Sequence, residues 1–170
     1  MEKQTRHTLS LLVENQPGVL SRVAGLFSGR GFNIESLCVA ETIDPQISRI
    51  TLVTTGDEQI IEQIKKQLNK LINVIKVVDL SEMDSVEREM ALIKVKAEPQ
   101  NRAEILRIVD IFRGKIVDVS PLYYTIEITG SADKLEAFIE LLKHFQIKEI
   151  ARTGTVALPR AKKDVKGKEE

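Results

Sequence analysis

The residues best suited to bind a small molecule lie in one short turn near the N-terminus. A run of alternating apolar residues ends at Asn15, Pro17 and Gly18 break it, and a helical pattern begins at Val19. Pro17 fits the first turn of a helix, where its missing N–H costs nothing, and Gly18 lets a ligand approach the backbone closely. Free N–H groups at a helix start suit a carboxylate, and the amide of Asn15 both donates and accepts. The same residues are also compatible with a strand–turn–helix connection that binds nothing.

A second candidate is Asn33, in the segment Gly31-Phe32-Asn33-Ile34. It stands near the start of a predicted strand, although asparagine is a poor strand former. The side chain therefore either caps the preceding turn or points at a ligand or a partner chain. Both readings remain open from the residues alone.

Catalytic side chains are scarce. His7 and His144 are the only histidines, and neither belongs to a nucleophile–base or metal-binding motif, so we interpret both as structural or surface residues. Cys38, between Leu37 and Val39 in a strand pattern, is expected to be a buried, unreactive thiol. The acidic pair Glu87 and Glu89 is interpreted as solvated linker. The sequence thus predicts no catalytic residue, no metal site and no cofactor in this chain.

Composition narrows the classes of function further. The 170 residues include twenty-five Lys and Arg and twenty-five Asp and Glu, so the net charge is zero and offers no general attraction to nucleic acid or an anionic membrane. No apolar run reaches the roughly 18 residues of a membrane helix, and the N-terminus lacks the apolar segment of a signal peptide. A single cysteine suits a reducing compartment. We therefore expect a cytoplasmic protein.

The apolar periodicities predict the same order of elements twice. In the first half, strands are expected over 6–14, 32–42, 47–55 and 73–80, with helices over 19–28 and from Asp57 onward. On the second strand, Ile34, Cys38 and Ala40 are expected on one face. In the second half, strands are expected over 88–97, 115–119, 122–129 and 147–158, with helices over 99–112 and after an N-cap at Ser131.

This pattern predicts an α+β protein of two tandem ferredoxin-like βαββαβ sandwiches. We place the first domain at 1–80, a linker at 81–87, the second domain at 88–158 and a disordered charged tail at 159–170. One face of each sheet is left open, so the chain is expected to form an oligomer, most simply a two-fold dimer. An RNA-recognition module has the same element order, but residues 47–53 carry none of the aromatic side chains it would need.

The turn and the strand after it resemble a known ligand-binding module. Residues 12–20 (LVENQPGVL), followed by 31–34 (GFNI), are similar to the ACT domain, a regulatory module that binds amino acids. The resemblance is narrower still to the regulatory small subunit of acetolactate synthase, also called acetohydroxyacid synthase. It rests on residues 17–28 (PGVLSRVAGLFS), 30–37 (RGFNIESL), 48–51 (SRIT), 86–89 (VERE), 111–119 (IFRGKIVDV) and 150–154 (IARTG).

The resemblance implies a non-catalytic chain that binds and activates a large catalytic subunit. In that family the large subunit uses thiamine diphosphate, Mg²⁺ and FAD, and it condenses two pyruvates, or pyruvate with 2-oxobutyrate, in branched-chain amino acid synthesis. The small subunit confers feedback inhibition by valine, and in some members by leucine or isoleucine. A free-standing ACT-type sensor that regulates another enzyme is the alternative, and the match in the second half disfavours it.

The resemblance also implies where the effector binds. In such subunits it lies between the ACT domains of a homodimer, where the turn of one chain faces the start of the second strand of the other. Carried over by motif, one chain contributes Asn15, Gly18, Val19 and Leu20, and the partner contributes Asn33 and Ile34. Ala40 matches a further family position near that site.

Overall fold

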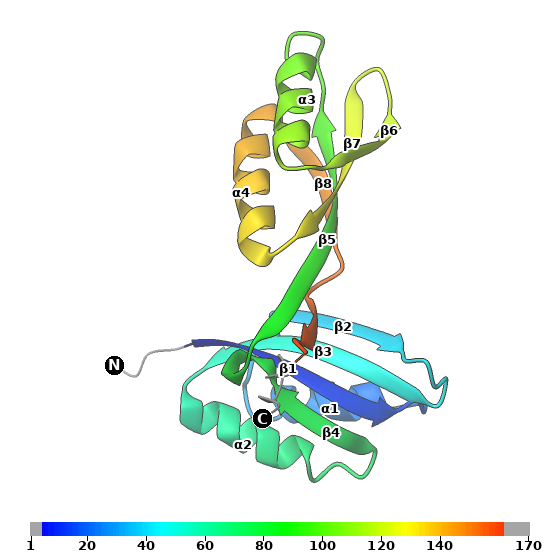
Figure 1. Ribbon diagram of the computed structural model, residues 1–170, viewed down its shortest axis with the longest axis vertical. Helices are drawn as coiled ribbons and strands as arrows, with labels where there is room; N and C mark the ends of the chain where they lie inside the picture. Colours follow the sequence, from blue (N-terminus) through cyan, green and yellow to red (C-terminus); the bar gives the residue numbers. More distant parts are fainter. Residues whose placement is uncertain (1–4, 162–170) are drawn as a thin grey trace, which may run out of the picture.

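The computed structural model describes residues 5–161, which form two lobes that share one long strand (Figure 1). Each lobe is an antiparallel sheet with two helices on one face, so the predicted α+β fold of two tandem ferredoxin-like sandwiches is confirmed. Residues 1–4 and 162–170 lie outside the described part, and most of the charged tail expected at 159–170 falls there.

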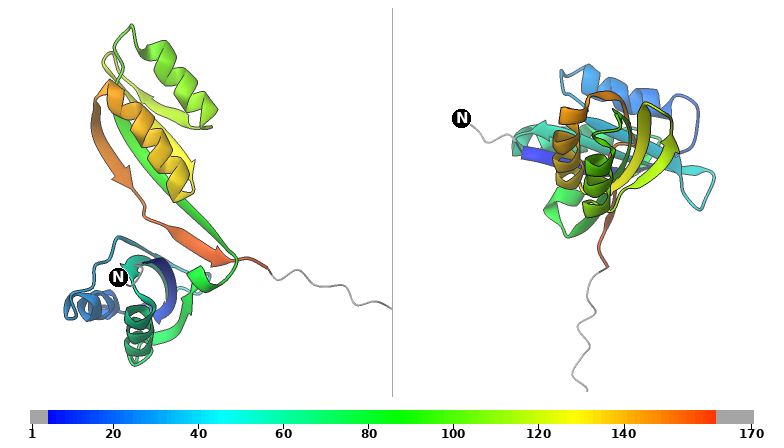
Figure 2. Two further views of the ribbon diagram at one scale, coloured as in Figure 1. Left: turned by 90° about the vertical axis from the view of Figure 1, so that its left-hand side faces the viewer. Right: turned by 90° about the horizontal axis from the view of Figure 1, so that it is seen from above.

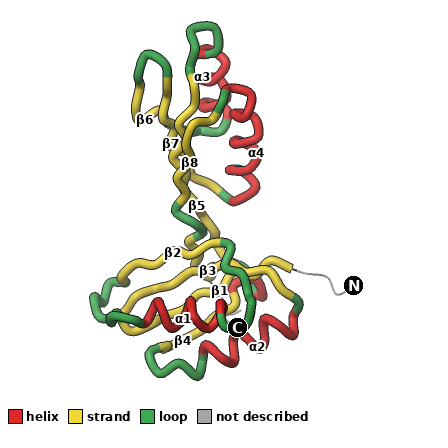
Figure 3. The backbone as a smooth tube through the Cα atoms, turned by 180° about the vertical axis from the view of Figure 1, so that it is seen from behind, coloured by secondary structure: helices red, strands yellow, loops and turns green. Residues whose placement is uncertain are grey.

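The N-terminal domain is built from six elements. They are β1 (Thr5–Glu14), α1 (Val19–Ser28), β2 (Ser36–Glu41), β3 (Ile47–Gly56), α2 (Glu58–Leu68) and β4 (Val74–Asp79). The sheet order is β2-β3-β1-β4, which makes β2 and β4 the edge strands. Figure 3 shows α1 and α2 covering the same face of this sheet. Alternating residues of β1 and β3 meet the apolar sides of both helices in a buried core of Leu9, Leu11, Val13, Val19, Val23, Phe27, Ile50, Leu52, Ile61, Ile64 and Leu68.

The C-terminal domain repeats this design. After a short 3₁₀ helix, η1 (Leu80–Glu82), come β5 (Ser85–Lys96), α3 (Arg102–Ile111), β6 (Lys115–Val119), β7 (Tyr123–Gly130), α4 (Ala132–Leu142), η2 (Lys143–Phe145), β8 (Ile147–Arg152) and β9 (Val156–Pro159). The main sheet has the order β6-β7-β5-β8. Its core contains Ala91, Ile93, Val95, Ile105, Val109, Ile126, Ile128, Leu135, Phe138 and Leu142.

The connection between the domains differs from the expected linker. β5 begins at Ser85, inside the range 81–87, and its first residues pair with β9. The last strand, expected without interruption over 147–158, is split into β8 and β9 because Gly154 takes a positive φ of 78° and turns the chain. The ribbon of β9 and the start of β5 lies over the face of the N-terminal sheet that the helices leave open (Figure 2, left).

β2 also differs from its prediction. It starts at Ser36, so Asn33 and Ile34 lie in a loop rather than in the strand. This loop is tied to β3, because Thr54 Oγ1 donates to the carbonyl of Asn33 at 2.7 Å. The predicted common face is wrong as well: Ile34 packs against the core under the helices, whereas Cys38 and Ala40 line the opposite side of the sheet. Cys38 is therefore partly exposed, not buried.

Candidate functional site

Asn15 connects three segments at one end of the N-terminal sheet. Its backbone N–H donates to the carbonyl of Gln46 at 2.7 Å. Its side-chain Nδ2 donates to Glu41 Oε1 at 3.0 Å and to the carbonyl of Pro45 at 2.9 Å. The amide oxygen, Oδ1, is therefore the atom of this side chain that can accept a hydrogen bond from a ligand. Sequence reasoning did not single out Glu41, whose carboxylate adds negative charge beside the turn.

The start of α1 provides donors at the same end of the sheet. Gly18 precedes the helix with φ 86° and ψ −10°, and no side chain caps the helix start. Among residues 5–161, the N–H groups of Leu20 and Ser21 donate to no backbone acceptor outside the helix. They also have no partner within it, because the residues four positions earlier lie before the helix start. Val19 is buried in the core, whereas Leu20 is 43% exposed. This turn therefore combines free donors for an anion with an accessible apolar side chain.

Asn33 and Ile34 lie at the other end of the same edge strand. The register shows this directly, because Ser36 at the start of β2 pairs with Val53, and Glu41 at its end pairs with Ser48. A strand of six residues spans about 20 Å. The structure therefore does not bring Asn33 and Ile34 together with Asn15 and Gly18 within one chain.

Ala40 is at the Asn15 end of β2 but belongs to a different surface. With Cys38 it lines a cavity of about 580 Å³ between the open face of the N-terminal sheet and the ribbon of β5 and β9. Arg49 and Leu158 also line this cavity. Because the uncapped start of α1 lies on the helical face, Ala40 and the turn at Gly18 do not share one pocket in the single chain.

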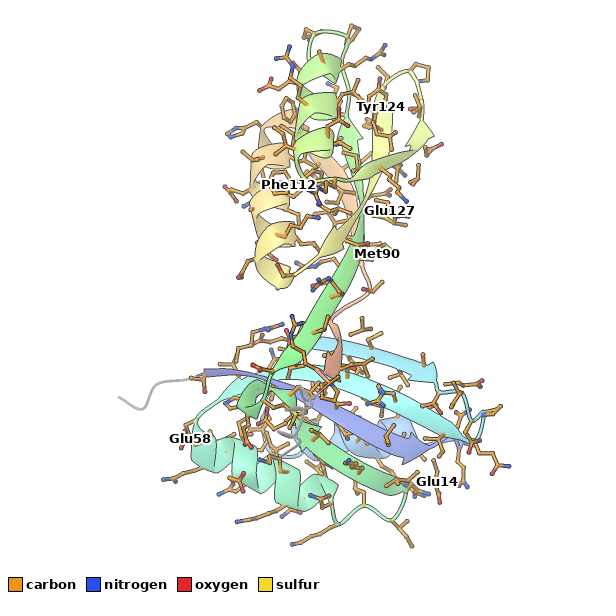
Figure 4. All side chains as sticks on the ribbon, viewed as in Figure 1. Glu14, Glu58, Met90, Phe112, Tyr124 and Glu127 are labelled. Carbon is orange, nitrogen blue, oxygen red and sulfur yellow. The ribbon has the colours of Figure 1, made fainter. Side chains whose placement is uncertain are left out.

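Sequence reasoning missed a polar cluster of the C-terminal domain, which lines a cavity that also has N-terminal residues in its wall. Figure 4 labels Met90 where β5 passes from one lobe to the other, and Glu14 at the far end of β1. Near this passage, the guanidinium of Arg152 binds Glu89 through Nε–Oε1 at 2.6 Å and Nη2–Oε2 at 3.1 Å. Its Nη1 reaches Glu136 Oε1 at 2.7 Å. These carboxylates, Glu89 above all, raise the pKa of Arg152 above its usual range.

The position of Glu89 overturns its interpretation as solvated linker. It lies in β5 and is only 6% exposed. The sequence does not predict the ion pair between Arg152 and Glu89, because the two residues are 63 positions apart and meet only when β8 pairs with β5.

Neither of the two histidines occupies a catalytic arrangement. His7 Nδ1 lies 3.1 Å from Asp79 Oδ2, and His7 Nε2 lies 2.8 Å from Thr5 Oγ1, so this ring ties β1 to β4. His144 is exposed in η2. Within 5–161, no three His, Cys, Asp or Glu side chains gather in a group that could hold a metal ion. No helix in that range is long and apolar enough to cross a membrane.

Comparisons with known proteins cover both domains. Residues 9–76 match the family model described as the AHAS small subunit-like ACT domain, and residues 88–161 match the model described as the small subunit of acetolactate synthase. A protein of Archaeoglobus fulgidus named "Probable acetolactate synthase small subunit" is 55% identical over 93% of this chain and 99% of its own length. The acetolactate synthase small subunit of Haemophilus influenzae is 53% identical over 94% of this chain and 99% of its own.

A solved structure agrees. The crystal structure of the acetolactate synthase small subunit from Thermotoga maritima aligns with a TM-score of 0.85 and 51% identity, over 93% of this chain and 99% of that one. Identity above one half thus extends over nearly the full length of both chains. The chain therefore belongs to the family of acetolactate synthase small subunits.

Proposed function

We propose that this chain is a regulatory subunit that activates the catalytic subunit of acetolactate synthase in the cytoplasm and makes it sensitive to feedback inhibition by valine. The observation that carries the proposal is the 55% identity to a probable small subunit over 93% of the chain. In this assembly the thiamine diphosphate, Mg²⁺ and FAD belong to the catalytic subunit, which condenses two pyruvates to 2-acetolactate and CO₂. The present chain contributes contacts and an effector site.

The effector site in this proposal is shared by two copies of the chain. The two groups of implied residues lie at opposite ends of β2, which is an edge strand. A two-fold axis beside this edge would run the two β2 strands antiparallel, so the end of one strand would lie by the start of the other. Asn15 and Gly18 of one chain would then face Asn33 and Ile34 of its partner. Two equivalent sites would result.

The chemistry of these groups matches a branched-chain amino acid. The free N–H groups of Leu20 and Ser21 suit the carboxylate. Asn15 Oδ1 and the nearby Glu41 carboxylate suit the ammonium group. The exposed side chain of Leu20 and the partly buried Ile34 offer apolar walls, and burying the isopropyl group of valine between them would contribute about 1.5–3 kcal/mol.

A shared site supplies a route to regulation. Because the proposed site needs residues from both chains, valine binds only the dimer arrangement in which the two half-sites face each other. Valine binding therefore raises the population of that arrangement. If the catalytic subunit has a different activity with this arrangement than with others, valine changes the reaction rate through linkage.

Reconstitution tests the function directly. The chain is mixed with a purified acetolactate synthase catalytic subunit, and acetolactate formation is measured with and without the chain and with added valine. We expect the chain to raise the rate and valine to lower it again. Leucine and isoleucine, added separately, would rank the effectors. No activation together with no valine response would overturn the proposal, and activation of a different enzyme would favour a free-standing sensor.

Substitution of the two asparagines tests the site. We expect Asn15→Ala and Asn33→Ala each to weaken valine binding by about ten- to a hundredfold, because each would remove a hydrogen bond to a charged group, worth about 1.5–3 kcal/mol. Isothermal titration calorimetry on the isolated chain measures the affinity. Asn69→Ala is the matched control, since in the described part of the chain its side-chain amide bonds only the carbonyl of Lys65, at the end of α2. Unchanged affinity in both site variants would refute the assignment.

A further inference from the structure

The chain passes between the two domains twice, and the two passages are tied together. One passage is β5 near Met90, and the other is the segment 153–155 between β8 and β9. The N–H of Thr153 donates to the carbonyl of Met90 at 3.0 Å, and the N–H of Met90 donates to Thr153 Oγ1 at 3.1 Å. The two passages therefore move as one unit rather than as independent linkers.

The second passage is fastened to the N-terminal domain at Ser36. The N–H of Thr155 donates to Ser36 Oγ at 2.8 Å. Arg6 supports this bond, because its Nη2 donates to Thr155 Oγ1 at 3.3 Å while its Nη1 reaches Glu87 Oε2 at 3.5 Å on β5. Thr155 is only 3% exposed, so water cannot readily replace Ser36 as the acceptor.

Gly154 allows the close approach on which this contact depends. A Cβ atom at Gly154 would lie 2.6 Å from Ser36 Oγ and 3.4 Å from the carbonyl oxygen of Leu37. The backbone there has a φ of 78°, which side-chain-bearing residues rarely adopt. We call Ser36, Gly154 and Thr155 the interdomain contact.

The interdomain contact lies next to one half of the proposed effector site. Ser36 follows Asn33 and Ile34 by three and two residues, and it opens β2. The intervening backbone is held at two points: the carbonyl of Asn33 accepts from Thr54 Oγ1, and the N–H of Glu35 donates to the carbonyl of Val53 at 2.8 Å. A segment so short and so fastened has little room to absorb a displacement, so a shift at Asn33 or Ile34 reaches Ser36.

From this geometry we infer that the interdomain contact transmits effector binding from the N-terminal domain to the C-terminal domain. Ser36, Gly154 and Thr155 are positioning residues: they set how the C-terminal domain is held relative to Asn33 and Ile34, and they touch no effector. The inference rests on the proposed function, because it assigns the route by which an effector at that site changes the rest of the molecule.

The test separates binding of valine from the response to it. Ser36→Ala removes the acceptor, and Gly154→Ala forces a Cβ against Ser36 Oγ. We expect the valine dissociation constant of either variant, measured on the isolated full chain, to stay within about threefold of the unsubstituted value. When the variant is reconstituted with the catalytic subunit, we expect maximal inhibition by valine to fall to about half or less of the unsubstituted value. Retained binding also shows that each variant folds.

Two matched controls carry the same chemical changes elsewhere. Ser28→Ala removes a hydroxyl whose one bond within residues 5–161 is to the carbonyl of Ala24 in α1. Gly25→Ala adds a Cβ on the exposed side of α1, where no described atom outside the helix backbone lies within 4 Å of it. Both controls should keep full inhibition. A loss in Gly25→Ala equal to that in Gly154→Ala would show that the effect does not depend on the contact with Ser36, and would overturn the inference.

A second readout needs no catalytic subunit. Hydrogen exchange of the Thr155 amide, followed by NMR, should change by at least about threefold when valine is added to the unsubstituted chain, and should not respond in Ser36→Ala. Full inhibition in both contact variants, or a loss that merely tracks weaker valine binding, overturns the inference and leaves the proposed function standing. Failure of the unsubstituted chain to bind or respond to valine overturns the proposed effector and the inference with it.

Discussion

A single guanidinium, that of Arg152, joins three elements at the base of the C-terminal domain. It binds Glu89 on β5 with two parallel hydrogen bonds and Glu136 on α4 with a third. The bidentate geometry suits arginine and not lysine. Glu89 is almost completely buried, so its carboxylate depends on this partner for compensation of its lost hydration.

Removal of this guanidinium should destabilise the chain clearly. We expect Arg152→Ala to lower the free energy of unfolding by about 1–3 kcal/mol, because the Glu89 carboxylate would remain buried with no cation. Urea denaturation followed by circular dichroism measures the change. Lys143→Ala is the control, since its ion pair with Glu140 is exposed to solvent, which screens it, so its removal should change stability little. Equal losses in the two variants would contradict this role of burial.

Individual residues were predictable where the signal is local. Pro17 and Gly18 indicated the start of a helix at Val19, and Ser131 was expected to cap another; both expectations are confirmed, the latter by a bond from the N–H of Lys134 to Ser131 Oγ at 3.4 Å. The bond between Ser36 and Thr155 was not predictable, because 119 residues separate its partners and only the finished fold brings them together.

At the level of elements, α1 differs from two other helices in how it begins. The side chain of Asp57 accepts from the N–H of Ile60 and caps α2, and Ser131 caps α4. α1 starts instead at Gly18, with no side-chain cap and no acidic residue in its first turn. This helix start therefore keeps free donors and a positive end that a bound carboxylate could complete.

The same substitution, glycine to alanine, should have opposite effects just before α1 and inside it. Gly18→Ala should lower the free energy of unfolding by about 1 kcal/mol, since Gly18 has a φ of 86°. Gly25→Ala should raise it by about 0.5–1 kcal/mol, because Gly25 is exposed inside the helix and nothing lies within 4 Å of its Cβ. Thermal unfolding of both variants without valine measures the pair. Two changes of the same sign would contradict the backbone geometry of this helix.

Periodicity predicted the types and order of the elements better than their ends. Apolar spacing located all four long helices and the strands of both sheets, because a buried face leaves a regular trace in the sequence. It failed at β2 and at the last strand. Before β2, the apolar Ile34 packs against the core from a loop, so its apolar character does not mark a strand. In the last strand, Gly154 turns the chain and divides a continuous strand-like sequence into β8 and β9.

For the whole molecule, the N-terminal sheet has an open face that the chain itself covers and an edge strand that it leaves unpaired. The ribbon of β5 and β9 already lies over the open face of the N-terminal sheet. The edge strand β2, by contrast, pairs only with β3 among the residues that the structure describes. Val39 on this strand is 39% exposed, and by alternation its side chain is on the same face as Leu37, which packs against the helices. An edge of this kind favours pairing with a second copy.

Val39→Lys should therefore weaken the proposed homodimer. A lysine on an edge strand opposes pairing, because its charge would have to be buried against the partner. We expect the dimer dissociation constant to rise by at least about tenfold, a cost of about 1.4 kcal/mol. Analytical ultracentrifugation should show a shift toward the 19.1 kDa single chain at concentrations where the unsubstituted chain sediments with twice that mass. Ile72 is highly exposed and lies just before β4, the opposite edge strand of the sheet. Ile72→Lys should therefore leave the dimer dissociation constant unchanged. An equal effect of both lysines, or of neither, would mean that β2 is not the dimer edge and that the two half-sites meet in some other way.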